Sequence, residues 1–255
     1  MSAGHAHRLY LPGDSAVHRL APECKLLAGL LFVMAVVATP PGWFSAFGGY
    51  AVLLALVAAL GGVPAGFVAR RAAIEVPFVA FAVLLPFIAR GARVEVLGLA
   101  LSAEGLLAAW NILAKGTLGV TTSILLAATT QPRDILLGAE RLRMPSVLLQ
   151  IATFMLRYAE VVVDDLRRMR IARESRCFRA RDVRGWVTLA RAGGALFVRT
   201  YERGERVYLA MLSRGYAGSM PRLAEHRAGA PEWAAAGALP AAAVLVGAVA
   251  WRMGG

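Results

Sequence analysis

Uncharged, apolar runs dominate the first half of the chain. Between Leu26 and Ala69 there is no Lys, Arg, His, Asp or Glu over 44 residues, which is long enough for two membrane-spanning helices of roughly 20 residues each. The middle of this run, "TPPGWF" at residues 39–44, has two prolines and a glycine that end a helix, and Trp43 that suits a membrane interface. The pattern therefore predicts two apolar helices joined by a short turn.

Three further runs repeat this apolar character. Val76–Ala89 is short for a span and contains two prolines, Gly105–Thr130 is interrupted only by Lys115, and Trp233–Trp251 has no charge and a Trp at each end. Together the runs predict an all-α membrane protein with about five transmembrane helices.

The stretch between the fourth and fifth spans is amphipathic instead. "QPRDILLGAERLRMP" at residues 131–145 opens and closes at a proline, which predicts one short helix. From residue 146 to about 176, apolar residues recur at helical spacing with charged residues on the other face, as in a long amphipathic helix. A second long helix is predicted from about 187 to 214, with the break between the two at Gly185–Trp186.

Composition agrees with a membrane protein. Hydrophobic residues make up 58% of the chain and charged residues 17%, whereas charged residues are about a quarter of a soluble domain. Of the net charge of +12, residues 157–227 contribute +8, from 16 Lys and Arg against 8 Asp and Glu. Positive charge near membrane spans marks their cytoplasmic side, and no nucleic-acid-binding motif accompanies this block. We therefore expect no nucleic acid partner.

The placement of charge predicts a topology. The N-terminal arm carries Arg19 and Lys25 and has no apolar core of a signal peptide, so we expect the N-terminus in the cytoplasm. The chain then divides into four transmembrane helices in residues 1–130, a cytoplasmic coupling domain of one short and two long helices in 131–230, and a last transmembrane helix in 231–255. This order leaves the C-terminus outside the cell membrane.

One seven-residue pattern occurs twice in the amphipathic stretch. "ARESRCF" begins at Ala172 and "AMLSRGY" at Ala210, 38 positions later. An arginine near a helix C-terminus is by itself mildly favourable, by about 0.3–1 kcal/mol, but that ordinary role does not explain why the Ala, the Ser and the aromatic ring repeat as well. We therefore predict two equivalent docking tips at two helix ends. Their central residues are Ser175, Arg176 and Cys177, and Ser213, Arg214 and Gly215.

The small residue after each arginine has a place in this prediction. Gly215 is a natural helix terminator because glycine readily adopts a positive φ. Cys177 occupies the same position and is small, but it is less suited to a positive φ.

These motifs resemble those of a known family. The chain is similar to the transmembrane T-component of energy-coupling factor transporters, in particular the cobalt type called CbiQ, whose members have two arginine motifs at the ends of two long cytoplasmic helices. The segment "AVHRLAPECKLL", with His18, Pro22 and Lys25, resembles the family's N-terminal segment, and "ATTQPRDILLGAERLRMP" resembles its first coupling helix. Nickel-type relatives look alike, and a vitamin-type T-component is an alternative.

The resemblance implies a division of labour in a bacterial cell membrane. Two ABC-type ATPase subunits bind ATP and Mg²⁺, and each receives one arginine tip. A separate membrane subunit binds the substrate, cobalt or nickel, and a small accessory membrane subunit fits the same scheme. This chain would then be a non-catalytic coupling subunit with no cofactor of its own.

The residues argue against a metal site and against an ATP site in this chain. His5 and His7 lack a third ligand at a defined spacing, so we expect no metal site in this chain. No glycine-rich loop has the Lys-Ser/Thr of a P-loop, so ATP binding is not expected. A self-sufficient membrane metal carrier with a basic cytoplasmic domain stays open as an alternative.

Overall fold

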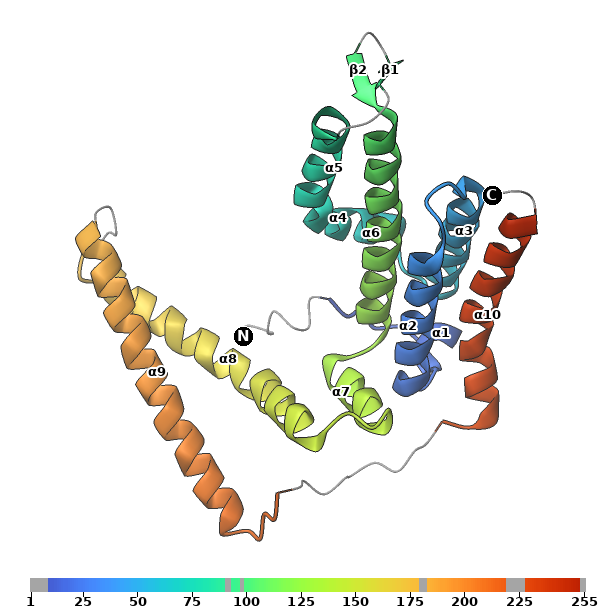
Figure 1. Ribbon diagram of the computed structural model, residues 1–255. Coiled ribbons are helices and arrows are strands. Elements are labelled where there is room, and N and C mark those ends of the chain that lie inside the picture. Colours follow the sequence, from blue (N-terminus) through green and yellow to red (C-terminus); the bar gives the residue numbers. More distant parts are fainter. Residues whose placement is uncertain (1–8, 90–92, 97–98, 179–182, 219–227, 253–255) are drawn as a thin grey trace. The chain divides into compact units, whose positions relative to one another are not determined.

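The computed structural model describes residues 9–89, 93–96, 99–178, 183–218 and 228–252 (Figure 1). The chain divides into two compact units, residues 1–143 with 227–255, and residues 144–226.

The first unit is built from apolar helices. Its helices are α1 (Ala16–Arg19), α2 (Pro22–Ala38), α3 (Phe44–Leu60), α4 (Ala65–Ala72), the 3-10 turn η2 (Ala73–Glu75), α5 (Val76–Ile88), α6 (Ala103–Thr129), α7 (Pro132–Arg141) and α10 (Ala230–Arg252). The turn predicted at residues 39–44 separates α2 from α3, although its last residue, Phe44, already belongs to α3. The short helix predicted between two prolines is α7.

A small hairpin, absent from the sequence prediction, connects α5 to α6. Strands β1 (Arg93–Val96) and β2 (Leu99–Ser102) pair antiparallel, with Arg93 opposite Ser102. The hairpin lies beyond the last turn of α5 and before the first turn of α6, at the top of Figure 1. The four-residue strands are too short to give a clear alternating pattern.

Among the residues that the structure describes, four helical segments are long and apolar enough to cross a membrane: Ala65–Ile88, Ala103–Thr129, Ser146–Glu174 and Ala230–Arg252. The third predicted span is short because Arg70, Arg71 and Glu75 interrupt the apolar run, whereas the helical segment continues back from α5 through η2 and α4 to Ala65. Helix α3 is apolar but has 17 residues. The all-α membrane fold is confirmed, while the cytoplasmic placement of the segment from Ser146 stays a prediction.

Helices α2, α3, α6 and α10 enclose the core of the first unit, where they lie side by side (Figure 1). Tyr50 of α3 is 1% exposed and meets Phe32 of α2 edge to face, with ring centroids 5.9 Å apart. Its hydroxyl lies 2.9 Å from Oγ1 of Thr39, at the end of α2. Lys115 of α6 donates to the carbonyl of Val37, 2.7 Å away. Polar side chains thus satisfy the last turn of α2, as a helix end in apolar surroundings requires.

The second unit consists mainly of two long helices, α8 (Ser146–Glu174) and α9 (Val183–Leu212). The predicted break at Gly185–Trp186 is wrong, because both residues lie inside the first turn of α9. Helix α8 ends at its own cap after Glu174. A glycine in a helix costs only about 1 kcal/mol relative to alanine, so Gly185 is not enough to end one.

Substitutions at Tyr50 test the core. We expect Tyr50→Ala to lower the free energy of unfolding by about 3–5 kcal/mol, as for other buried aromatic residues. Tyr50→Phe removes only the hydrogen bond to Thr39 and should cost about 1 kcal/mol. Thermal unfolding of the detergent-solubilised chain measures both. Val52→Ala, at a position 68% exposed on the same helix, is the control, and an equal loss in all three variants would contradict this account of the core.

Candidate functional site

The repeat extends far beyond the seven-residue motif. At the spacing of 38, the last residue of α8, Glu174, matches the last residue of α9, Leu212. The first residue of α8, Ser146, matches position 184, one residue inside α9. The second unit is therefore a helix with its cap, present twice.

The two copies run in opposite directions (Figure 1). Near the start of α8, Gln150 donates from Nε2 to the carbonyl of Gly218 at 2.8 Å and accepts a hydrogen bond from the hydroxyl of Tyr216, just beyond the end of α9. Further along, Arg203 of α9 donates from both terminal nitrogens to Oδ2 of Asp165 on α8, each at 3.2 Å. The helices are thus antiparallel.

The ion pair joins equivalent residues of the two copies, because 203 − 165 is also 38. Each motif arginine follows the ion pair by the same number of residues, since 176 − 165 and 214 − 203 both equal 11. At 1.5 Å per residue, each lies about 16 Å along its helix from the pair. The two arginines therefore lie toward opposite ends of the helix pair, at equal distances from its centre.

The two helix ends form the same hydrogen bonds. At the end of α8, Phe178 N–H donates to the Arg173 carbonyl at 3.1 Å and Cys177 N–H donates to the Glu174 carbonyl at 3.0 Å. This 6→1 and 5→2 pair defines a Schellman cap. Arg176 lies inside this cap, directly before Cys177.

The second end repeats this cap bond for bond. Tyr216 N–H donates to the Met211 carbonyl and Gly215 N–H to the Leu212 carbonyl, both at 3.0 Å. The residue in the left-handed position has φ +82° at Gly215 and φ +55° at Cys177. Cys177 thus adopts the positive φ that its equivalence to Gly215 requires, although a side chain there is strained.

The serine of each motif is held by its own helix. Ser175 Oγ donates to the Ala172 carbonyl at 3.1 Å, and Ser213 Oγ donates to the Ala210 carbonyl at 3.0 Å. These bonds explain why the Ser repeats: a short side chain on the last turn satisfies an otherwise free carbonyl.

Both motif arginines are exposed and unpaired among the residues that the structure describes. All six motif residues are exposed, and over the described residues neither Arg176 nor Arg214 forms an ion pair or side-chain hydrogen bond. Each tip therefore offers a free guanidinium, which has five N–H donors in a planar fork.

A band of large apolar side chains on α9 is also uncovered. Phe197 is 69% and Tyr201 60% exposed, whereas Tyr158 and Val162 of α8 are half-buried. Sequence periodicity predicts that these four side chains are buried in the assembled protein. Within this unit α8 covers little of Phe197 and Tyr201, so their burial stays a prediction for the complex.

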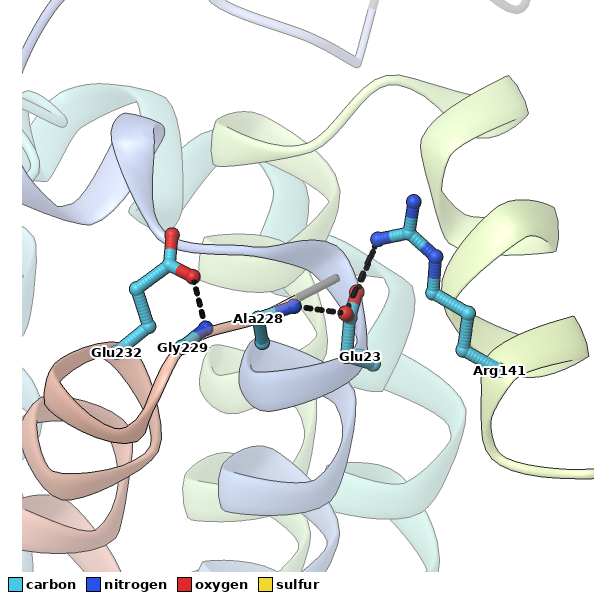
Figure 2. A network of polar contacts seen from close by, with 5 residues as sticks. All are labelled: Glu23, Arg141, Ala228, Gly229 and Glu232. Carbon is cyan, nitrogen blue, oxygen red and sulfur yellow. Dashed lines mark hydrogen bonds and ion pairs between the residues drawn. The ribbon is translucent and has the colours of Figure 1, made fainter. Parts of the chain in front are cut away.

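A second polar site, which the sequence did not predict, lies in the first unit at the start of α2. Glu23 is 4% exposed. Its two carboxylate oxygens accept hydrogen bonds from one terminal nitrogen of Arg141 at 3.0 and 2.9 Å, and one of them also accepts from the Ala228 amide at 3.1 Å (Figure 2). These residues come from α2, from the end of α7 and from the segment before α10.

The ionised carboxylate is favoured at this junction. Burial by itself would raise the pKa of Glu23, but the hydrogen bonds from its own backbone amide, from Arg141 and from Ala228 hold that pKa below its ordinary value. Glu23 lies ahead of the uncharged run that begins at Leu26. It is therefore a buried anion that is fully paired, as a buried charge has to be.

One turn of α2 also holds Lys25, next to this junction. Its ammonium donates to the carbonyls of His18 and Thr129, both at 3.0 Å, and to Oγ1 of Thr130 at 3.3 Å. These three bonds use all three N–H groups. Burial lowers the pKa of Lys25 to about 8, while the carboxylate of Asp134 acts in the opposite direction. Lys25 thereby ties the start of α2 to the end of α6.

Close backbone contact completes the seat of α7 on α2. A Cβ at Gly138 would lie 2.9 Å from the backbone nitrogen of Glu23 and from the carbonyl carbon of Pro22. Because these are backbone atoms, only glycine lets α7 approach this closely.

The described residues include no group of three or more His, Cys, Asp or Glu side chains that could hold a metal ion. His5 and His7 lie outside the described residues.

The matched caps give a stability prediction. Cys177→Gly relieves the strain of a side chain at φ +55° and should raise the free energy of unfolding by about 1 kcal/mol. Gly215→Ala introduces the same strain at the other cap and should lower it by about 1 kcal/mol. Amide exchange at the last turns of α8 and α9 measures each change locally. Equal effects of the same sign in the two variants would contradict the equivalence of the caps.

Comparison with known proteins agrees with this architecture. The model of the "Cobalt transport protein" family, CbiQ, matches residues 13–224. The chain is 29% identical over 228 residues to the energy-coupling factor transporter transmembrane protein EcfT of Bacillus selenitireducens, covering 84% of each chain. It is 27% identical over 238 residues to the cobalt transport protein CbiQ of Rhodobacter capsulatus, covering 91% of this chain and 92% of that one.

An uncharacterized protein of Methanocaldococcus jannaschii is 32% identical over 121 residues, and this match spans 47% of the chain and 41% of that relative. The family model covers most of the chain and includes both arginine tips and α7. The chain belongs to the CbiQ family of cobalt transport proteins, and it is a multi-pass transmembrane component of an energy-coupling factor transporter.

Proposed function

We propose that this chain is the non-catalytic coupling subunit of an importer for cobalt or nickel, with two ABC-type ATPase subunits as its cytoplasmic partners. Each ATPase receives one tip, through Ser175, Arg176 and Cys177 or through Ser213, Arg214 and Gly215. Other membrane subunits bind the substrate. ATP and Mg²⁺ belong to the ATPases, and the metal is cargo of the substrate-binding subunit.

The observation that supports two equal partners is the equivalence of the two helix ends. They share a cap, bond for bond, and lie at equal distances from the Asp165–Arg203 pair. A single partner would give no reason to keep both ends alike. Two copies of one partner, or two closely similar ones, require two docking tips of the same shape.

The chemistry of a tip fits a groove lined with acceptors. A guanidinium forms paired hydrogen bonds with carboxylates, and such charge-assisted bonds are about twice as strong as neutral ones. The Schellman cap turns the backbone away after the arginine, so the tip is narrow. Exposed aromatic residues further back along α9, Phe197 and Tyr201 among them, add apolar surface to the same unit.

We assign the membrane orientation from charge. The positive-inside rule puts the N-terminus and residues 131–230 in the cytoplasm and the C-terminus outside. The chain then comprises transmembrane helices in 1–130, coupling helices in 131–230 and a last transmembrane helix in 231–255. In this arrangement both tips face the compartment that holds ATP.

Alanine substitutions at the two arginines test the docking role. Arg176→Ala or Arg214→Ala should each reduce co-purification of the ATPase by about tenfold or more, because losing one partner of a buried interface charge typically costs about 2–5 kcal/mol. The double variant should lose both ATPases and cobalt uptake. Both arginines are exposed, so each substitution should change the free energy of unfolding by no more than about 0.5 kcal/mol.

Arg168 and Arg206 provide the matched control. They are exposed and are themselves equivalent at the spacing of 38, two turns before each tip. Their double alanine variant should bind ATPase normally. Normal ATPase association and uptake with both Arg176 and Arg214 replaced would contradict the docking role.

Metal binding separates this function from that of a self-sufficient carrier. Calorimetry on the chain without residues 1–7, in detergent, should show no stoichiometric binding of Co²⁺ or Ni²⁺, because a transition-metal site needs several converging His, Cys or carboxylate ligands. Micromolar binding at one site per chain would favour the carrier.

A further inference from the structure

The second unit is connected to the first by two stretches of chain. The chain leaves the first unit after Arg143 and re-enters it at Arg227. Arg141 lies just before the exit and Ala228 just after the return. Both are bound by one carboxylate, that of Glu23 in the first turn of α2 (Figure 2).

This carboxylate is suited to hold two connections at once. Glu23 has a side chain 5% exposed and Arg141 one that is 23% exposed, so the pair is largely protected from water. Oε1 accepts from both Arg141 and the Ala228 amide, and Oε2 accepts from Arg141. An ionised carboxylate has about four acceptor sites and no donor, whereas an apolar pair of equal volume would leave the Ala228 amide without a partner.

Helix α2 contacts several helices of the first unit, so a displacement of α2 would be passed on to them. It packs against α6, α7 and α10, and its middle residues Phe32 and Val36 lie in the core at 0% and 1% exposure. Lys25, on the same turn as Glu23, fixes the residues just before α7 through Thr129 and Thr130. One turn of α2 therefore holds both ends of α7: Lys25 binds the residues before its start, and Glu23 binds Arg141 at its end.

We propose that Glu23 is a positioning residue that fastens both connections of the 144–226 unit to α2, so that displacement of that unit reaches the membrane helices. This inference rests on the proposed coupling function. Without a common anchor, the two connections could bend independently of each other. Movement of the 144–226 unit would then change the connections and leave α2 in place. With Glu23 in place, Arg141 and Ala228 have to move together and take α2 with them.

Amide hydrogen exchange on the full chain in nanodiscs tests the anchor without any ligand. Glu23→Gln keeps an oxygen for the Ala228 amide but loses the charge that holds Arg141. We expect exchange in the last turn of α7 to rise about tenfold, with little change at residues 228–229. Glu23→Ala should raise exchange in both segments.

Glu232 offers a matched control. It too is a glutamate that accepts from a backbone amide of this segment, that of Gly229 at 2.9 Å, but it makes no bond to α7. Glu232→Ala should raise exchange only around residues 229–232. Unchanged exchange in α7 for both Glu23 variants would overturn the anchor, and so would an equal rise throughout α3 and α6, which indicates general destabilisation.

Coupling is then measured in the complex reconstituted with the ATPases and the substrate-binding subunit. With Co²⁺ as the probe, Glu23→Gln should lower the metal transported per ATP hydrolysed several-fold, while ATPase co-purification stays normal. An unchanged ratio would overturn the positioning role. Failure of the proposed function looks different, since it would show as normal ATPase association after loss of Arg176 and Arg214.

Discussion

The arrangement of the 144–226 unit depends on one ion pair between equivalent residues. Asp165 and Arg203 lie 38 positions apart, the same spacing that relates the two arginine motifs, and their side chains are 20% and 34% exposed. Because the contact is made at matching points of two antiparallel copies, the arms beyond it are equal in length. The position of this ion pair explains why Arg176 and Arg214 lie at equal distances from it. The antiparallel direction of the two helices explains why the two arginines lie on opposite sides of it.

The hydrogen bonds at the two tips and those at the Glu23 junction have different structural consequences. At the tips, a Schellman cap and a serine satisfy the last carbonyls of each helix, and Arg176 and Arg214 are exposed there. At the junction, Glu23 and Lys25 are buried and fully paired, so the start of α2 is held from several sides. The proposed coupling function needs both features: helix ends that can bind another protein, and a start of α2 that is held rigidly.

Local patterns in the sequence predicted much of this, and distant contacts could not be predicted. The apolar runs gave the helices of the first unit, the two prolines around residues 131–145 gave α7, and the repeated "SR" motif gave two equivalent ends. The predicted break at Gly185–Trp186 was wrong because that prediction relied on a single glycine. Helix α8 instead ends at the cap that contains Cys177, whose positive φ is uncommon for a residue other than glycine. The Glu23 junction was missed because its partners lie 118 and 205 residues away.

The central claim is that two equivalent tips each bind one ATPase. The direct measurement is site-specific photocrosslinking from Ser175 and from Ser213, both exposed, in the intact complex, with mass spectrometry of the products. The account predicts that each position alone attaches one ATPase subunit and that both together yield a species with two ATPases on one chain. Attachment from only one position, or attachment of both positions to something other than an ATPase, would contradict it.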